Sequence, residues 1–188
     1  IMLNDVSAYY PNLMKSQNMN PGHMVDGFFT KYVTDNINDD KYWKSKIGVI
    51  EGAKAKRGGT KLKNNAGFGK YGDPYSPLYD FSITLETTVN GQMKLLKLID
   101  MYFERTDAKV INANTDGVAI LVSAKYNDTI CDCNRDWEVM FNLELDEEYY
   151  TQWIQKSCNI YMAVQDNGKI KGINEFQTTY NLEKGMGI

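Results

Sequence analysis

The stretch that decides the fold is the first one, Ile1-Met2-Leu3-Asn4-Asp5-Val6-Ser7-Ala8-Tyr9-Tyr10-Pro11-Asn12-Leu13-Met14. It opens with a short apolar run that leads directly into the carboxylate of Asp5, and two tyrosines and a proline follow. A short apolar run bounded by such a breaker predicts a buried strand, and Pro11 favours extended or turn geometry at Tyr10. The sequence therefore predicts one carboxylate at the end of a core strand, with aromatic rings directly behind it.

A second carboxylate that can meet the first lies in Asn114-Thr115-Asp116-Gly117. Two β-rich runs, 109–113 and 118–122, flank this polar segment and predict a β-hairpin. Phosphoryl transfer uses two divalent ions about 3.5–4 Å apart. Two aspartates are the smallest protein contribution to such a site, because Mg²⁺ keeps waters and substrate phosphates as its other ligands. For Asp116 alone, ordinary turn chemistry is the plainer interpretation.

Composition favours one globular domain, or one domain with a small appendage, and excludes few functions. The 188 residues carry a net charge of −3, which does not indicate a nucleic-acid binder, although local basic clusters remain able to bind phosphate. The single histidine, His23, offers no support for a Ser-His-Asp triad. No apolar run reaches the length of a membrane span. Three cysteines, an odd number, favour a reducing compartment.

We therefore expect a cytoplasmic protein with no membrane partner. Cys131 and Cys133 lack a second pair, which makes a structural zinc site improbable. The chain begins at Ile1, inside its own predicted core strand, so we expect it to be a fragment of a longer protein.

The segments between the two aspartates predict a mixed region before a long helix. Residues 12–20 suit a short helix, 28–33 are β-like and dissolve into a polar loop, and 40–56 are compatible with a helix. Gly58-Gly59 predicts a break, after which Thr60 caps a helix from 61 to about 68, and an irregular passage follows. Residues 83–105 are the clearest helix. Its predicted core face consists of apolar residues at steps of three and four: Leu85, Val89, Met93, Leu96, Ile99 and Phe103.

The C-terminal half predicts one more helix and a series of strands. The helix spans 127–143, with its apolar side formed by Ile130, Trp137, Met140 and Phe141. The strands are 144–154, 157–165 and 169–176, the last two joined by a turn at 166–168. The order of elements predicts an α+β fold, in which helices back one face of an antiparallel sheet.

A second candidate site lies in the segment from Lys61 to Gly72. On a helix, Lys61 and Asn65 share a face and Phe68 lies one turn further. Lys61 suits a triphosphate as a point charge, and Asn65 and Phe68 suit a nucleobase or minor-groove surface. Taken alone, a solvated basic helix followed by a Gly-rich loop is the commoner interpretation.

A third candidate combines Lys156 and Tyr161 with the segment Lys169-Ile170-Lys171-Gly172. Lysines and a tyrosine on neighbouring strands suit contact with a sugar-phosphate backbone. Edge-strand lysines that discourage aggregation explain them equally well.

Together these segments resemble the family B DNA polymerases, and more closely their viral and phage members. The expected compartment is therefore the host cytoplasm if the chain is phage-encoded. Asp5-Val6-Ser7-Ala8-Tyr9-Tyr10-Pro11 is similar to the family's motif A, D-x-x-S-L-Y-P. The segment from Lys61 to Gly69 is similar to motif B, K-x-x-x-N-S-x-Y-G, with Ala66 for Ser and Phe68 for Tyr. Asn114-Thr115-Asp116-Gly117 is similar to motif C, D-T-D-S.

Weaker similarities extend the resemblance along nearly the whole chain. Residues 83–92 resemble the helix that precedes the hairpin of motif C. Asn159-Ile160-Tyr161 resembles the family's lysine-tyrosine primer-strand motif, and Lys171-Gly172 matches a Lys-Gly that follows it. Three further positions depart from the family's pattern: Asn114 and Gly117 replace the first Asp and the Ser of motif C, and Asn159 replaces the lysine of the primer-strand motif.

The resemblance implies a palm domain with a ferredoxin-like core and a small helical fingers insertion. The palm comprises residues 1–27, with motif A, and 74–188, with motif C and the start of the thumb-proximal strands. The fingers insertion comprises residues 28–73 and ends in motif B.

The resemblance also assigns roles. Asp5 and Asp116 are the catalytic acids, which with the Val6 carbonyl hold two Mg²⁺ or Mn²⁺ ions. The nucleotide-binding residues are Ser7, Ala8, Tyr9, Tyr10, Lys61 and Asn65, with Tyr10 as a steric gate against a 2′-hydroxyl. The DNA-binding residues are Phe68, Gly69, Thr115, Lys156, Tyr161 and Lys171. The implied reaction is attack by a primer 3′-hydroxyl on the α-phosphate of a dNTP, and the implied partners are primer–template DNA, dNTP, and the exonuclease and thumb domains of a parent polymerase.

Two alternatives stay open at this point. One is a palm-like fragment that binds nucleic acid or a partner protein, or is too incomplete to polymerise. The other is a palm-type nucleotidyl cyclase, which needs no template and would leave Asn65 and Phe68 without a duplex to contact.

Overall fold

The computed structural model describes residues 1–172 and 176, apart from the side chain of Asn65, and it divides into two compact units. Unit 1 joins Ile1–Val6 to Lys94–Ile188, and unit 2 is Ser7–Met93. Helix α4 (Phe81–Arg105) crosses the boundary between them. Within the described residues, no helix has the length and apolar character needed to span a membrane.

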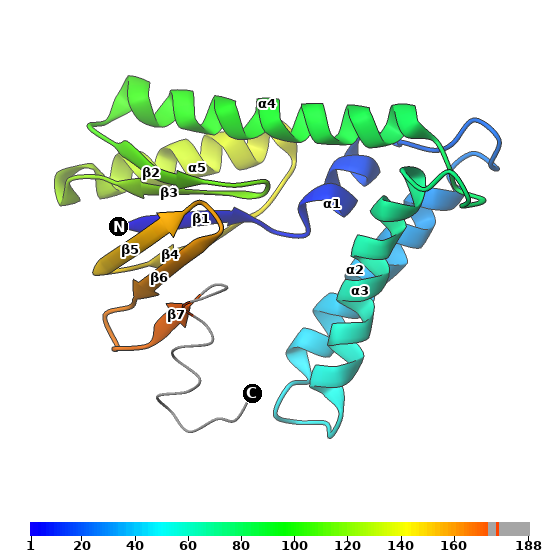
Figure 1. Cartoon of the computed structure of the whole chain (residues 1–188), viewed down its shortest axis with the longest axis horizontal. Coiled ribbons are helices and arrows are strands. Elements are labelled where there is room, and N and C mark those ends of the chain that lie inside the picture. The colour runs from blue at the N-terminus through cyan, green and yellow to red at the C-terminus, as the bar shows by residue number, and fades with distance from the viewer. Residues whose placement is uncertain (173–175, 177–188) are drawn as a thin grey trace. The chain divides into compact units, whose positions relative to one another are not determined.

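The main sheet of unit 1 has four antiparallel strands in the order β2-β3-β1-β4 (Figure 1). They are β1 (Met2–Val6), β2 (Lys109–Ala113), β3 (Gly117–Leu121) and β4 (Leu145–Tyr149). The predicted first strand and the predicted hairpin are both confirmed. β1 is a central strand with apolar residues on both faces. Met2 and Val6 are buried on one face and Leu3 is buried on the other.

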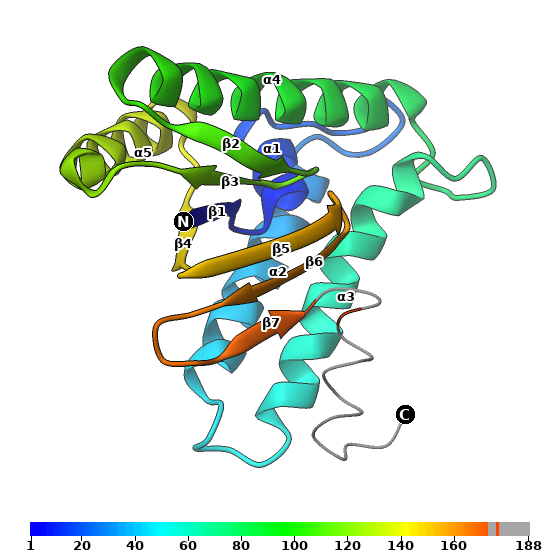
Figure 2. The same ribbon diagram turned by 60° about the vertical axis from the view of Figure 1, so that its left-hand side comes forward.

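Two helical segments cover one face of this sheet, the C-terminal half of α4 and α5 (Asn127–Phe141), as Figures 1 and 2 show. A short 3₁₀ turn, η1 (Ala124–Tyr126), leads into α5. Ile130 and Trp137 of α5 are fully buried, as predicted, and the Trp137 indole N–H donates to the Lys94 carbonyl oxygen at 2.7 Å. Met140 is exposed, which corrects its predicted place on the apolar side. The α+β class, an antiparallel sheet backed by helices, is confirmed.

A second antiparallel sheet of unit 1 has the order β5-β6-β7. Its strands are β5 (Gln152–Ser157), β6 (Ile160–Val164) and β7 (Ile170–Gly172). The predicted single strand over 144–154 is wrong, because the chain leaves the first sheet after Tyr149 and enters the second at Gln152. The predicted turn at 166–168 is confirmed by the Gln165 N–H bond to the Lys169 carbonyl at 2.9 Å. Most of the predicted strand beyond Gly172 falls outside the described residues.

Unit 2 contains α1 (Tyr9–Ser16), α2 (Phe28–Ser45), α3 (Ala53–Tyr71) and the N-terminal half of α4. Its core gathers one or more residues from each helix and from the connecting segments: Met14, Met19, Phe29, Val33, Ile37, Tyr71 and Ile83. Unit 2 is wider than the predicted insertion over 28–73, and the palm and fingers boundaries stay predictions.

Three local predictions for α2 and α3 are wrong. Residues 28–33 are helical, because Phe29, Val33 and Ile37 recur every four residues and pack as one face of α2. Gly58-Gly59 does not break α3, and Thr60 lies buried inside that helix instead of capping it, with its hydroxyl donating to the Lys56 carbonyl at 3.0 Å.

α1 begins at Tyr9, earlier than predicted. Tyr10 is therefore helical, not extended, because Pro11 falls in the first turn of α1, where the proline's missing N–H has no helical partner to lose. The first turn of a helix is one of the few places where a proline fits without breaking it.

The predicted core face of α4 is also wrong, although the helix itself is confirmed. Most of the predicted face is exposed: Leu85, Val89, Met93, Leu96 and Phe103. The buried face instead carries Ile83, Thr87, Gly91, Leu95, Leu98, Met101 and Tyr102. At Gly91 a Cβ would lie 3.3 Å from Leu13 Cδ1, so the small residue permits the close approach of α1 within unit 2.

A buried polar ring ties β1 to α4 and α5 within unit 1. Asn4 Nδ2 donates to the Tyr102 hydroxyl at 2.9 Å, this hydroxyl donates to Asn134 Oδ1, and Asn134 Nδ2 returns to Asn4 Oδ1 at 3.3 Å. Asn134 Nδ2 also donates to Glu147 Oε1 at 2.6 Å. The ring members are almost completely buried, so each bond replaces water that the interior excludes.

Replacing Tyr102 with Phe is expected to lower the free energy of unfolding by about 2–6 kcal/mol, because it leaves two buried polar atoms, Asn4 Nδ2 and Asn134 Oδ1, without this partner at about 1–3 kcal/mol each. Denaturant unfolding followed by circular dichroism measures the change. Tyr75→Phe is the matched control, since the Tyr75 side chain is 97% exposed and its hydroxyl reaches water in both states. Equal free energies for the two variants would contradict this account of the ring.

Candidate active site

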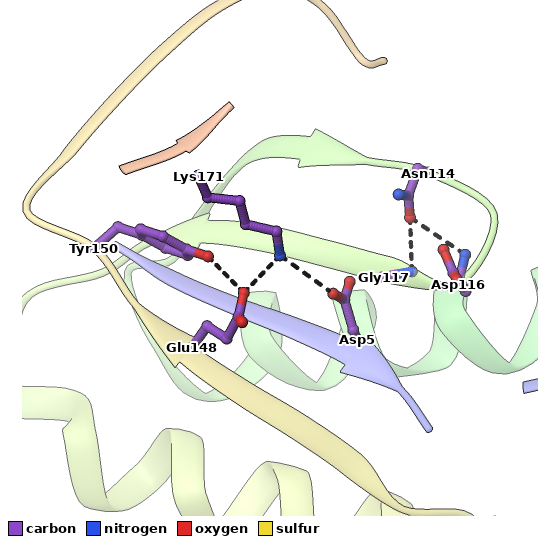
Figure 3. A network of polar contacts seen from close by, with 7 residues as sticks. All are labelled: Asp5, Asn114, Asp116, Gly117, Glu148, Tyr150 and Lys171. Carbon is purple, nitrogen blue, oxygen red and sulfur yellow. Dashed lines mark hydrogen bonds and ion pairs between the residues drawn. The ribbon is translucent and has the colours of Figure 1, made fainter. Parts of the chain in front are cut away.

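Antiparallel pairing of β1 with β3 brings the two predicted acids to neighbouring positions in unit 1 (Figure 3). Asp5 lies opposite Gly117 in the register, and Asp116 immediately precedes Gly117 at the start of β3. The Val6 N–H donates to the Asp116 carbonyl oxygen at 2.7 Å, which extends the ladder by one bond. Val6, the predicted carbonyl ligand, is thereby fixed at the end of β1 beside the hairpin turn.

Asn114 builds the turn that presents Asp116. Its side-chain Oδ1 accepts the backbone N–H groups of Asp116 at 3.2 Å and of Gly117 at 2.8 Å, and its own N–H donates to the Gly117 carbonyl at 3.0 Å. An asparagine does this with a neutral amide oxygen. The departure from motif C at this position therefore keeps a turn-forming side chain and removes one negative charge.

Gly117 is the residue that lets the Asp5 carboxylate lie against β3. A Cβ built at Gly117 would be 2.0 Å from Asp5 Oδ1 and 3.0 Å from the Asn4 carbonyl oxygen. No such contact is tolerable, so any larger residue requires Asp5 to move. Sequence reasoning registered Gly117 only as a departure from Ser and missed this packing role, which depends on a cross-strand neighbour.

Four further polar side chains surround Asp5: Lys171, Glu148, Tyr150 and Asp146. Lys171 Nζ lies 2.6 Å from Glu148 Oε2 and 3.9 Å from Asp5 Oδ2, and the Tyr150 hydroxyl also donates to Glu148 (Figure 3). Asp146 pairs directly with Asp5 in the register of β1 and β4. Sequence reasoning missed Asp146, Glu148 and Tyr150, although their spacing of two in a strand places them on one face.

The electrostatics of Asp5 follow from this crowding. The pKa of the Asp5 carboxyl is raised to about 6: burial is the largest cause, the nearby Lys171 ammonium lowers the pKa, and the charges of Asp116, Glu148 and Asp146 raise it. Burial alone would lower the pKa of Lys171, but its hydrogen bond to Glu148 and the charge of that group raise it above its ordinary value. Asp5 is therefore an acid whose charged form needs a compensating cation.

A pH dependence of stability follows from the raised pKa of Asp5. Its folded-state pKa of about 6 exceeds the ordinary value of 3.8, so the folded state binds the proton more tightly. The stability contribution of this group is fully present below about pH 4 and is lost as the pH rises through about 6. Asp5→Asn is therefore expected to raise the melting temperature at pH 7.5 but not at pH 4.

Thermal unfolding across this pH range measures the effect, and Asp26→Asn, at an exposed residue, is the matched control. A melting-temperature difference for Asp5→Asn that stays constant with pH would contradict the assignment.

The donor set suits a hard divalent cation. Asp5 and Asp116 offer carboxylate oxygens, the ligand type that Mg²⁺ prefers. Among the described residues, no group of three or more His, Cys, Asp or Glu side chains is arranged to hold a metal ion by itself. Two acids fit an ion that takes its remaining ligands from water and substrate phosphates, as Mg²⁺ does with phosphorylated substrates.

The predicted nucleotide-binding residues at the start of unit 2 lie around the N-terminus of α1. Ala8 has left-handed backbone angles, φ 44° and ψ 50°, at the N-cap. The Ser7 carbonyl accepts the Asn12 side-chain amide at 2.8 Å. Tyr9 is buried, and its hydroxyl donates to the Gly91 carbonyl oxygen. Tyr9 therefore has a packing role in unit 2.

The structure brings Tyr10 together with Phe68, two residues predicted for neighbouring tasks from different motifs. Their rings are stacked, with centroids 4.3 Å apart and an interplanar angle of 28°. Lys61 and Gly69 are exposed on the same helix as Phe68, and the side chain of Asn65 lies outside the described part of the chain. Within unit 2, an aromatic stack thus joins the segments that resemble motifs A and B.

The remaining predicted DNA contacts lie in unit 1. Thr115 is exposed in the hairpin turn and Lys156 is exposed on β5. Tyr161 is buried and stacks on Trp153 with ring centroids 4.4 Å apart. Lys171 is engaged with Glu148 and lies beside Asp5, so its observed partners are carboxylates of the candidate site.

Comparison with known proteins yields a likeness in fold. No model of a protein family and no curated protein sequence matches the chain. Among solved structures, it is similar to the family B DNA polymerase from the hyperthermophilic archaeon Pyrobaculum calidifontis, with a TM-score of 0.66 at 15% sequence identity. The similarity covers 92% of this chain and 26% of that polymerase, so the chain spans about a quarter of its length. The fold of this chain therefore resembles a fragment of a family B DNA polymerase.

Proposed function

We propose that the chain forms the palm and fingers of a DNA-templated DNA polymerase, which adds dNMP to a primer 3′-hydroxyl and releases pyrophosphate. One observation carries the proposal: in a fold that resembles a polymerase fragment, strand pairing places Asp5 and Asp116 at neighbouring strand ends. Two acids at that position are what phosphoryl transfer on a nucleoside triphosphate requires of the protein.

In this proposal, Asp5, Asp116 and the Val6 carbonyl hold two Mg²⁺ or Mn²⁺ ions. The bound ions would activate the attacking 3′-hydroxyl and offset charge on the transferred phosphate. The protein's own task is to keep both carboxylates ionised and in place. Lys171 serves this by supplying a positive charge 3.9 Å from Asp5 Oδ2, and Glu148 holds the lysine there.

The residues of unit 2 bind the incoming nucleotide in this proposal. The Lys61 ammonium group binds the phosphates as a point charge, and Asn65 faces the base. The Tyr10 ring, held by its stack on Phe68, excludes a 2′-hydroxyl by filling its position. Ser7 and Ala8, at the N-terminus of α1, add contacts to the same nucleotide in this proposal.

Primer–template DNA is the second substrate in this proposal. Phe68, Gly69, Thr115, Lys156, Tyr161 and Lys171 are its proposed contacts. The parent protein is of viral or phage type, acts in the cytoplasm, and supplies exonuclease and thumb domains.

Template-directed incorporation of a single nucleotide tests the proposed function. Each dNTP is offered separately, with Mg²⁺ or Mn²⁺, to primers whose templates differ in one unpaired base. The proposal expects extension only by the complementary dNTP. Products formed without a template would indicate a cyclase or another template-free enzyme, and DNA binding without extension would indicate the inactive alternative.

A further inference from the structure

The loop end of the α2–α3 hairpin concentrates positive charge. Residues 41–63 contain seven lysines, Arg57 and a single acid, Glu51. This segment therefore has a net charge of +7 in a chain whose total is −3. Most of these lysines are exposed: Lys41, Lys44, Lys54, Lys56, Lys61 and Lys63. Arg57 lies 3.4 Å from Asp40 and connects α3 to α2. The charge therefore forms a local field that the overall composition conceals.

Aromatic rings lie among these charges. The rings of Tyr42 and Trp43 meet edge to face, with centroids 4.9 Å apart. Lys56 Nζ lies 4.4 Å from the centre of the Trp43 ring and so links α3 to α2, and Lys46 Nζ lies 5.5 Å from the centre of the Tyr42 ring. Tyr42 is half exposed. We define Tyr42, Trp43, Lys46 and Lys56 as the tip cluster.

The tip cluster is separate from the proposed nucleotide position on the same helix. Lys56 and Phe68 are twelve residues apart on α3, about 18 Å at 1.5 Å of rise per residue, and Lys56 is five residues, about 8 Å, from Lys61, the proposed phosphate contact. A dNTP that lies between Phe68 and Lys61 therefore ends short of Lys56, and the tip cluster stays available to another ligand. Its combination of lysines and aromatic rings is the one used for single-stranded nucleic acid, where lysines contact phosphates and rings stack on bases.

We propose that the tip cluster binds single-stranded nucleic acid. Phosphates contact Lys46 and Lys56, and an unpaired base stacks on Tyr42. The loop also exposes Val49 and Ile50, which a lipid surface would accept. We favour nucleic acid over lipid because the positive charge is not confined to the apolar loop. The exposed lysines continue along both α2 and α3, and this length suits the phosphates of an extended strand. The identity of this strand rests on the proposed polymerase function, in which it is the unpaired template.

Fluorescence anisotropy with an oligothymidine of about 20 nucleotides and an abasic strand of equal length tests the proposal. Lys46→Gln/Lys56→Gln is expected to weaken oligothymidine binding about tenfold at low salt. Because each phosphate contact on a single strand contributes about −0.7 to the slope of log K against log salt, the slope is expected to become shallower by about 1.4. Tyr42→Ala is expected to weaken oligothymidine binding about tenfold and to leave the abasic strand unchanged.

Lys31→Gln/Lys70→Gln is the matched control, because it removes two charges from the same helices, where each lysine pairs with an aspartate at 2.5 and 2.8 Å. Equal weakening by the control pair, or equal loss of both strands with Tyr42→Ala, would overturn the proposal. So would tip variants that lose binding to phosphatidylserine vesicles but keep oligothymidine affinity.

This binding assay needs neither metal ions nor catalysis, so its outcome is distinguishable from failure of the proposed function. Tip-dependent strand binding in a protein that never extends a primer would refute polymerisation alone. Normal extension with unchanged strand binding in the tip variants would refute the tip site alone.

Discussion

Asp116→Asn is expected to lower template-directed nucleotide incorporation by about a thousandfold or more. The substitution removes one of the two carboxylates proposed to hold the divalent ions, and a metal ion supplies several kcal/mol of transition-state charge stabilisation. Three factors of ten correspond to about 4 kcal/mol at 1.36 kcal/mol each. The backbone bonds of the turn, made by the Asp116 N–H and carbonyl oxygen, are available to Asn as well.

Single-turnover incorporation in Mg²⁺ measures the effect of Asp116→Asn, and unfolding curves confirm that the variant is folded. Asp166→Asn is the matched control, because Asp166 is exposed in the turn between β6 and β7. Incorporation by Asp116→Asn within about threefold of the control would exclude Asp116 from the reaction, since loss of a metal ligand predicts a far larger effect.

Gly117→Ala is expected to lower incorporation about a hundredfold by displacing Asp5. The new Cβ would be 2.0 Å from Asp5 Oδ1, so the carboxylate must rotate or the strands must separate. A displacement of about 1 Å in a reacting group is enough to lower a rate about a hundredfold. The affinity for Mn²⁺ is expected to fall with the rate, because the displaced group is a proposed metal ligand.

Gly58→Ala is the control for Gly117→Ala. Gly58 lies inside α3, and nothing is within 4 Å of a Cβ built there. Alanine in a helix interior is expected to be neutral or stabilising by up to about 1 kcal/mol. A Gly117→Ala protein with unchanged rate and unchanged Mn²⁺ affinity would show that the position of Asp5 is not critical.

The sequence predicts the core of unit 1 well because its signals there are local. An apolar run ending at Asp5, a hairpin around Asp116 and the long helix of 83–105 can each be recognised without knowing a neighbour, and each is confirmed. The resemblance of the motifs then predicts that the two acids meet. The strand register is consistent with this prediction, because Asp5 pairs with Gly117, the residue after Asp116.

The face of α4 that packs inward shows the limit of periodicity. Leu85 and Val89 outrank Thr87 and Gly91 on any hydrophobic scale, yet the smaller pair is buried. Gly91 is buried because Tyr9 and Leu13 approach its backbone closely, a constraint from another helix. Periodicity identifies the helix, and only packing partners identify its inner side.

The α2–α3 region was mispredicted for a related reason. Gly58-Gly59 has poor intrinsic helix propensity, but α3 continues through it while packing along α2. Tertiary contacts of this kind override intrinsic propensity. The side chains of Glu148 and Lys171 beside Asp5 were not foreseen as a pair, because they depend on how strands from two sheets come together.

Electron paramagnetic resonance of Mn²⁺ tests the central claim most directly, because it asks whether Asp5 and Asp116 hold divalent ions without requiring turnover. Free Mn²⁺ is titrated with the protein in the presence of a dNTP, and the loss of the free-ion signal beyond that caused by the dNTP alone reports binding to the protein. The wild-type chain is expected to bind Mn²⁺ at least about tenfold more tightly than either Asp5→Asn or Asp116→Asn. Equal Mn²⁺ affinity of the wild-type protein and both variants would contradict the account.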